Sequence, residues 1–377
     1  MIKPKKQIVF VNQSAGYLMI DIIDAFKDSY EERILITGFL NPRNKTLDAT
    51  VKVEKLISYD RSSTIKRIFT WVWAFLKILF LIKFKYPKAH LFLVSNPPFT
   101  AWIPLFCKNS YDILIYDIYP DALVEFGYFK KDSWIVKKWE NINRKVYAKA
   151  RKISTITNGM QERIAKYVNK EEVNVVPIWT DNSFLKPIPK SENAFLKTHQ
   201  VEDKFIVMYS GNMGKAHPVE VLIELAIQFQ NKTEIFFLLI GGGDKYREME
   251  ALIAENKLQN IKILPWQDTK KLPFTLSGAD LALVTVGNEA SDLSIPSKTY
   301  NLMSVGTPIL CVAPKEAALS KLVDSENIGG VFESKEIKEI KNFVMKCINN
   351  KEFFNMLSKN SLDLSLKYSS KNTQFFK

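Results

Sequence analysis

The chain has 377 residues, which is enough for two domains of ordinary size. Hydrophobic residues make up 46% of it and charged residues 25%, and these values exclude a disordered chain, a collagen and a coiled coil. Lys and Arg outnumber Asp and Glu by 53 to 40, and the whole excess lies in residues 1–190, which hold 31 basic and 18 acidic residues. Ten of the 14 glycines lie after residue 190. We therefore expect a first domain that meets an anionic partner and a second domain whose backbone approaches a ligand closely.

The cysteines and histidines are few and scattered. Cys107, Cys311 and Cys347 suit buried thiols in a reducing compartment better than a disulfide framework or a zinc site. The three histidines show no metal-ligand spacing, so we predict no metal site. The start, MIKPKKQIVFV, runs from basic residues straight into a strand-like segment, which predicts no signal peptide.

Strand-like runs alternate with helical segments along the chain. In the first half we predict strands over residues 7–11, 33–37, 90–95, 113–117, 153–157 and 173–177, with helices over 18–29, 64–82, 134–150 and 160–168. In the second half the predicted strands are 205–210, 235–240, 261–264, 281–285 and 309–312, with helices over 218–230, 246–256, 269–277, 297–305 and 336–349. Apolar strands that alternate with helices indicate parallel sheets. The predicted fold class is α/β, with two doubly wound Rossmann-like domains facing a cleft.

The polar, proline-containing stretch between the halves predicts the domain boundary. We expect an N-terminal Rossmann-like domain over residues 1–185, which carries the basic excess, a linker over 186–203 and a C-terminal Rossmann-like, ligand-binding domain over 204–360. Residues 361–377 are expected to form a tail that packs back on the N-terminal domain.

Glycine-rich turns follow several predicted strands, where open α/β sheets bind their ligands. Gly16 follows the first strand, although a glycine at such a turn also has steric explanations. In the second half GNMGKAH follows residues 205–210, and Gly241–Asp244 follow residues 235–240. Two such turns suit a nucleotide diphosphate held by amide groups and helix N-termini. Neither turn is a P-loop or a GxGxxG fingerprint.

A third element is the helix predicted over residues 297–305. Pro296 suits the first turn of a helix, so Ser297 and Lys298 lie at a positive N-terminus that favours a phosphate. The alternative is a well-capped surface helix with no ligand.

The order of these motifs is specific. YSGNMGKAHP, FFLLIGGGD, ILPWQD and SIPSKTYNLMSVGTPIL in the second half, with SNPPF, YDIYPDAL and VVPIWTDNSF in the first, resemble the retaining, nucleotide-sugar-dependent glycosyltransferases of the GT-B fold. Within these, the chain resembles the bacterial branch that builds colanic-acid-type exopolysaccharide, capsule and O-antigen. The resemblance implies a metal-independent enzyme without a cofactor, which uses a UDP- or GDP-linked sugar.

Some residues depart from the superfamily pattern. Asn212 stands where an arginine is common, and Lys215 or His217 must serve for a nearby lysine. Leu293 and Asn301 stand in place of two glutamates. Asn301 can still bind a ribose hydroxyl, whereas Leu293 cannot act as a carboxylate, so an inactive family member is one alternative.

The resemblance and the residues together give the expected site. We expect Lys298 to stabilise the departing diphosphate and Asp117 to act on the acceptor hydroxyl, unless Asp117 only caps a turn. Trp266 is expected to border the nucleobase, or else to be an ordinary packed side chain. The full set expected to bind the donor is Gly16, Gly211, Asn212, Gly214, Lys215, Gly242, Trp266, Ser297 and Asn301.

Residues 64–85 form an apolar segment flanked by basic residues, and its character indicates where the enzyme meets its acceptor. The apolar part is too short to cross a bilayer. Its flanking basic residues and tryptophans match a helix lying on an anionic leaflet, and the alternative is an internal helix that covers the sheet. We expect a peripheral protein on the cytoplasmic side of the cell membrane, with a polyprenyl-diphosphate-linked saccharide as acceptor. The expected membrane residues are Lys66, Arg67, Trp71, Trp73 and Lys83.

Two functions from other classes stay open. A two-domain nucleotide-sugar epimerase would have a similar cleft but no need of a membrane. A basic nucleic-acid-binding α/β protein would fit the charge, although the basic residues are dispersed and the glycine turns lie in the neutral half.

Overall fold

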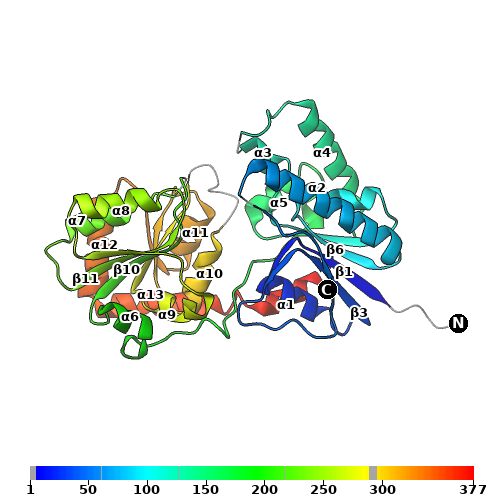
Figure 1. Cartoon of the computed structure of the whole chain (residues 1–377). Helices are drawn as coiled ribbons and strands as arrows, with labels where there is room; N and C mark the ends of the chain where they lie inside the picture. Colours follow the sequence, from blue (N-terminus) through cyan, green and yellow to red (C-terminus); the bar gives the residue numbers. More distant parts are fainter. Residues whose placement is uncertain (1–5, 61, 126, 216, 288–294) are drawn as a thin grey trace. The chain divides into compact units, whose positions relative to one another are not determined.

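The computed structural model describes residues 6–60, 62–125, 127–215, 217–287 and 295–377. The chain forms two compact units (Figure 1): unit 1 comprises Met1–Ile178 with Ser370–Lys377, and unit 2 comprises Trp179–Ser369. Unit 1 carries 31 basic and 17 acidic residues, whereas unit 2 carries 22 and 23. The positive charge of the chain therefore belongs to unit 1.

Unit 1 is built on a seven-stranded sheet in which all neighbouring strands are parallel. Every residue of β6 (His90–Val94) and β7 (Tyr111–Ile115) is buried, as expected for strands covered on both faces. The strand order is β5 (Lys52–Lys55), β3 (Glu32–Thr37), β1 (Gln7–Val11), β6 (His90–Val94), β7 (Tyr111–Ile115), β8 (Lys152–Thr155) and β9 (Val173–Val175). A small separate sheet pairs β2 (Ser14–Gly16) with β4 (Phe39–Asn41).

Helices cover both faces of this sheet. On one face α1 (Tyr17–Ala25) packs with the C-terminal η7 (Ser370–Phe376), and the ring of Phe376 meets that of Phe92 edge to face at 5.6 Å. The other face buries α2 (Thr64–Phe80), which continues into the π-helix η1 (Leu81–Lys85), together with α4 (Trp134–Tyr147) and α5 (Asn158–Ile164). Short helices η2 (Pro98–Leu105), α3 (Asp121–Glu125) and η3 (Lys170–Glu172) connect these elements.

Unit 2 is built on a six-stranded parallel sheet. Its order is β12 (Ile261–Leu264), β11 (Ile235–Gly242), β10 (Phe205–Asn212), β13 (Leu281–Thr285), β14 (Ile309–Val312) and β15 (Gly329–Phe332). The strand order reverses between β10 and β13, which makes their carboxyl ends the expected ligand position. The helices are η4 (Lys190–Glu192), α6 (Ala194–His199), α7 (Val221–Gln228), α8 (Tyr246–Glu255), η5 (Thr269–Lys271), α9 (Leu272–Ser277), α10 (Ser297–Ser304), α11 (Ala318–Ser325), α12 (Ile337–Asn349) and α13 (Lys351–Ser365).

The predicted α/β class with two doubly wound sheets is confirmed. The prediction missed the short strands β2 and β4 of the small sheet and two strands of the large sheets, β5 and β15. β5 is largely charged and exposed, and β15 begins with two glycines. Predicted strand 113–117 begins two residues too late and runs beyond the observed end of β7. The stretch expected as a linker contains α6, whose Phe195 and Leu196 are buried in unit 2.

Candidate functional site

Glycines of two neighbouring strands lie close together at the carboxyl edge of the unit 2 sheet, near the ends of β10 and β11. Gly211 of β10 lies beside Gly241 of β11, and Asn212 lies beside Gly242. Gly241 has φ +143°, and a Cβ on it would lie 1.9 Å from the carbonyl oxygen of Gly211. Only glycine therefore fits at position 241.

Hydrogen bonds hold the turn after β10 in place. The Tyr209 hydroxyl donates to the carbonyl oxygen of Asn212 at 2.6 Å. The Lys245 Nζ atom donates to the carbonyl oxygen of His217 at 2.9 Å, and the Nδ1 atom of His217 lies 3.1 Å from the Thr285 Oγ1 atom at the end of β13. The turn thus connects β10 to β13 at the point where the strand order reverses.

Lys298 lies in the first turn of α10 and reaches across to this turn. Its Nζ atom is buried, although the residue as a whole is partly exposed, and it lies 3.9 Å from the centre of the Tyr209 ring. A Cβ on Gly211 would lie 2.5 Å from the same Nζ atom. Among the described residues this nitrogen has no hydrogen-bond partner. Burial lowers the pKa of Lys298 to about 7.

A buried ammonium without an acceptor is costly, so its presence indicates a place prepared for an anion. The N-terminus of α10 adds to this preference through its helix dipole. Pro296 precedes the helix and Ser297 opens it with an exposed side chain. The hydroxyls of Ser358 and Ser361 on α13 donate to the carbonyl oxygens of Gly306 and Thr307, which fixes the opposite end of α10.

The surrounding charges reinforce this preference. Burial lowers the pKa of His217, and the nearby Lys298 and Lys245 lower it further. Lys245 is paired with Glu220, whose carboxylate lies 2.5 Å from the Nζ atom. An arriving diphosphate would be attracted by Lys298 and would raise the pKa of both Lys298 and His217.

The remaining donor-site predictions in unit 2 fall in different places. Trp266 is 62% exposed and lies against Gly242, where a Cβ would be 2.8 Å from its Nε1 atom. Gly214 approaches the Asn212 amide in the same turn, whereas the Lys215 side chain is exposed. Asn301 is buried, and its Oδ1 atom accepts a hydrogen bond of 2.6 Å from the Thr180 hydroxyl. Leu293 lies outside the described residues.

Unit 1 holds the other predicted site residues. Gly16 belongs to β2 and lines a pocket of about 480 Å³ whose other walls include Phe39 and Tyr59. Asp117 is exposed and lies two residues after Ile115, the last residue of β7. The Ser95 hydroxyl oxygen accepts hydrogen bonds from the backbone amides of Tyr116 and Asp117, at 3.0 and 3.1 Å, which fixes this turn.

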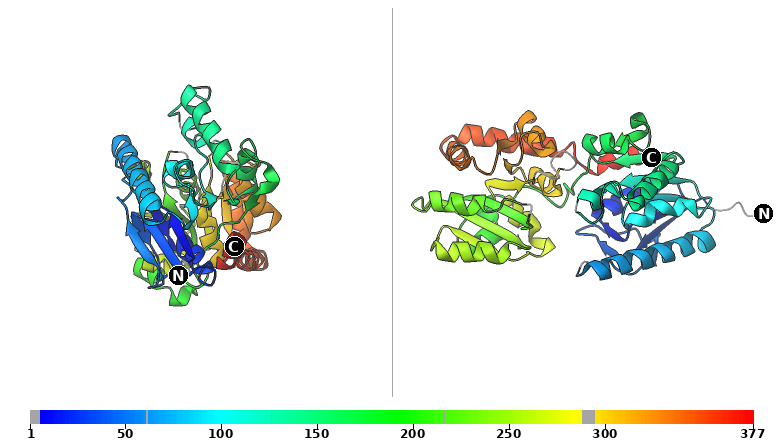
Figure 2. Two further views of the ribbon diagram at one scale, coloured as in Figure 1. Left: turned by 90° about the vertical axis from the view of Figure 1, so that its right-hand side faces the viewer. Right: turned by 90° about the horizontal axis from the view of Figure 1, so that it is seen from above.

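Helix α2 lies along the outside of the unit 1 sheet, as the long blue helix of Figures 1 and 2 shows. It buries Thr70, Ala74 and Ile78 against the sheet, so it is a sheet-covering helix. The remaining surface of α2 and η1 nevertheless exposes a set of large apolar side chains, which we call the α2 apolar face: Ile65, Ile68, Phe69, Val72, Trp73, Leu76, Phe80 and Phe84.

The residues expected at a membrane do not all point the same way. Lys66, Trp73 and Lys83 are exposed, whereas Arg67 and Trp71 are half-buried. Trp71 stacks on Tyr59 at 5.6 Å between ring centres. Over the described part of the chain, no helix combines the length and apolar character that crossing a membrane requires.

Sequence reasoning missed three residues that build the donor-side site, namely Tyr209, Lys245 and Thr285. Thr285 ends β13 and Lys245 follows the glycine turn, so inspecting every strand end would have found both. Tyr209 gave no signal, because inside an apolar strand it resembles a core residue.

Comparison with known proteins agrees with this geometry. Residues 190–363 match the family model for glycosyl transferases group 1. Over this stretch, which is a little under half of the chain and lies in unit 2, the chain is similar to the group 1 glycosyltransferases. It is 26% identical over 218 residues to the probable glycosyltransferase WbjE of Pseudomonas aeruginosa, covering 58% of this chain and 54% of that protein. It is 29% identical over 176 residues to WcaI of Escherichia coli K12, named for colanic acid biosynthesis, covering 46% of this chain and 43% of that protein. The chain thus matches about half the length of these curated relatives.

Solved structures show the same fold over nearly the whole chain. HepE of Anabaena in complex with UDP-glucose is similar with a TM-score of 0.70 and 16% identity, covering 98% of this chain and 97% of that one. WaaG, a glycosyltransferase involved in lipopolysaccharide biosynthesis, is similar with a TM-score of 0.68 and 12% identity, covering 95% of each chain. The fold is GT-B, which confirms the resemblance found in the sequence.

Proposed function

We propose that this protein transfers a sugar from a UDP-linked donor to a lipid-linked saccharide acceptor during synthesis of a bacterial surface polysaccharide. The observation that carries the proposal is the buried Lys298 ammonium beside Gly211, with no hydrogen-bond partner among the described residues. The position suits a diphosphate, because the N-terminus of α10 and a buried cation lie together there.

In this reaction the bond between the sugar and the diphosphate breaks, so negative charge grows on the departing diphosphate. Lys298 stabilises that charge and is already held in place by the Tyr209 ring and by α10. Because the ammonium is removed from water, its interaction with the diphosphate is stronger than that of an exposed lysine. Trp266 borders the base, and we retain the other donor-site residues named from the sequence as part of this proposal.

The choice of a UDP-sugar rests on similarity. HepE, whose fold this chain shares, was solved with UDP-glucose, and the relatives WbjE and WcaI are named as glycosyltransferases. WcaI also suggests the surface-polysaccharide role.

Unit 1 supplies the acceptor side of the proposal. Asp117, exposed at the end of the sheet, would orient the acceptor hydroxyl or accept its proton. The α2 apolar face, flanked by exposed Lys66, Lys77 and Lys83 on a unit with a large basic excess, suits the anionic inner leaflet of the cell membrane. Each basic residue near such a surface contributes about 1 kcal/mol. This seating would present a lipid-linked acceptor to the enzyme.

The test begins by measuring the melting temperature of the protein with each of a panel of nucleotide-sugars. The nucleotide-sugar that raises the melting temperature most is then used as the donor. Release of its nucleoside diphosphate is then measured with polyprenyl-diphosphate-linked saccharides as acceptors. We expect Lys298→Met to slow release by about 100-fold, as for other losses of a charge aimed at a leaving group. Lys338→Met, which changes an exposed lysine on α12, is the matched control and should act like wild type. Wild-type turnover by the Lys298 variant, or a screen in which no nucleotide-sugar stabilises the protein, would contradict the proposal.

A further inference from the structure

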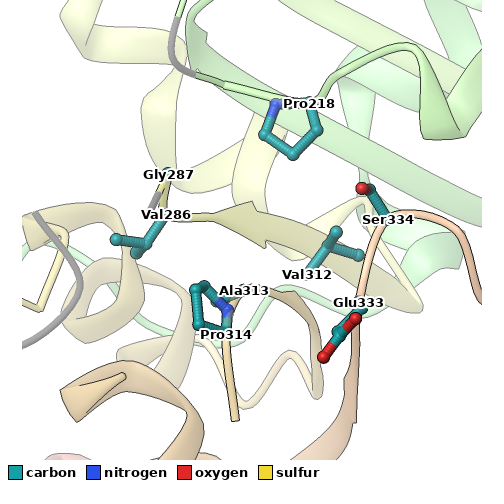
Figure 3. A pocket seen from close by; sticks show the side chains of 8 residues that line it. All are labelled: Pro218, Val286, Gly287, Val312, Ala313, Pro314, Glu333 and Ser334. Carbon is teal, nitrogen blue, oxygen red and sulfur yellow. The ribbon is translucent and has the colours of Figure 1, made fainter. Parts of the chain in front are cut away.

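Unit 2 holds a pocket of about 610 Å³ at the carboxyl edge of its sheet (Figure 3). This volume lies within the range of about 300–1,000 Å³ typical of small-molecule sites. Pro218, just before α7, closes one side. Val312, the last residue of β14, lines the pocket as well. The other walls are pairs of residues that directly follow three neighbouring strands: Val286 and Gly287 after β13, Ala313 and Pro314 after β14, and Glu333 and Ser334 after β15.

The pocket lies next to the proposed donor site along the same edge of the sheet. Trp266 lies against Gly242 at the end of β11, and the Nζ atom of Lys298 lies beside Gly211 at the end of β10. The next strands in the sheet are β13 and β14, where the pocket begins. Adjacent strands are about 4.8 Å apart, so the step from β11 to β14 is roughly 14 Å. A nucleotide-sugar carries its base, diphosphate and sugar in the same order.

The polar groups of the pocket gather on one side. In Figure 3 the Glu333 carboxylate and the Ser334 hydroxyl lie opposite Val286 and Gly287. The Lys335 Nζ atom lies 3.0 Å from the Glu333 carboxylate, and this hydrogen bond lowers the pKa of Glu333. An ionised carboxylate can only accept hydrogen bonds, so it suits a ligand that presents hydroxyl donors.

Apolar surface completes the match to a sugar. Pro218 and Pro314 supply apolar carbon atoms, which suit the carbon-bound hydrogens of a pyranose ring. From this arrangement we infer that the pocket receives the sugar of the donor and that Glu333 determines which sugar is accepted by pairing with its hydroxyls. The inference rests on the proposed function and adds a specificity-determining residue to it.

The experiment compares UDP with UDP-glucose, since the two differ only by the sugar. Dissociation constants are measured by calorimetry for the wild type, for Glu333→Gln and for Glu316→Gln. Glu316 is an exposed glutamate after β14 that does not line the pocket, so it is the matched control. We expect Glu333→Gln to bind UDP within twofold of wild type and UDP-glucose about tenfold more weakly, as for loss of a charged hydrogen bond. Repeating the series with UDP-galactose should show a wild-type preference between the two sugars that Glu333→Gln reduces.

The outcomes separate this inference from the proposed function. Wild-type binding of UDP-glucose and UDP-galactose by Glu333→Gln would overturn the inference while leaving the donor site at Lys298 intact. Equal weakening of UDP and UDP-glucose would also overturn it, because Glu333 would then act on the nucleotide or on the fold. Failure of the wild type to bind any of the three ligands would instead count against a UDP-linked donor.

Discussion

Replacing Lys298 by methionine should make the protein more stable while weakening its donor binding. The folded state lowers the pKa of this lysine from 10.5 to about 7, so below pH 7 it must hold a buried ammonium that the unfolded chain leaves in water. At about 1.4 kcal/mol for each unit of pKa, the cost has an upper limit of about 5 kcal/mol. Methionine keeps the length of the side chain and its contact with the Tyr209 ring without a charge. We expect the variant to gain about 1–3 kcal/mol at pH 7, less than the limit because the site relaxes.

The sign of the pH dependence follows from proton linkage. Between pH 7 and 10.5 the unfolded chain binds more protons at this lysine than the folded chain does, so wild-type stability rises with pH. The advantage of Lys298→Met is therefore greatest below pH 7 and shrinks by up to about 1.4 kcal/mol for each pH unit above it. Urea unfolding of both proteins from pH 6 to 9 measures this, with Lys338→Met as control. A variant that is less stable than wild type, or a difference that does not change with pH, would refute the reasoning.

Three further changes test other parts of the account. Trp266→Ala should weaken UDP binding by about 1–3 kcal/mol, which is the usual contribution of base stacking. Its melting temperature should not change, because the side chain is 62% exposed. Calorimetry measures the binding and melting curves measure the stability, and unchanged UDP binding would contradict the prediction. Gly241→Ala should lower the melting temperature, since its methyl group would meet the Gly211 carbonyl oxygen, and an unaltered melting temperature would be the contrary result. Changing Phe69, Trp73 and Phe80 together to Ser should abolish co-sedimentation with phosphatidylglycerol vesicles and leave circular dichroism unchanged, because all three side chains are exposed. Equal sedimentation of variant and wild type would instead assign the α2 apolar face to another partner.

Much of the fold could be predicted because its strands are continuous apolar runs between helices. Residues 261–264, 281–285 and 309–312 were predicted with the bounds that β12, β13 and β14 have. Polar or glycine-containing segments gave no such pattern. β5 pairs with β3 through its backbone although its sequence is KVEK, and β15 is GGVF. In these strands the neighbouring strand, rather than local propensity, decides the conformation.

The site was predictable only in part. The glycine-rich turns indicated Gly211 and Gly241, and the helix start predicted at Pro296 indicated Lys298. The structure places these three residues together. The sequence could not show that the Lys298 ammonium is buried over the Tyr209 ring, because that depends on side-chain direction across two elements. Nor could it show that Asn301 is engaged by Thr180, which lies far away in sequence.

The central claim is that the Lys298 ammonium receives the diphosphate of the donor. Its most direct test is calorimetry of nucleotide-sugar binding at pH 7.5 in two buffers that differ in ionisation enthalpy. A lysine with a pKa of about 7 is partly deprotonated at this pH, and a bound diphosphate returns its pKa toward the ordinary range. The account predicts net proton uptake when the wild type binds a nucleotide-sugar, and a smaller uptake by Lys298→Met. Binding by the wild type with no proton uptake would contradict it.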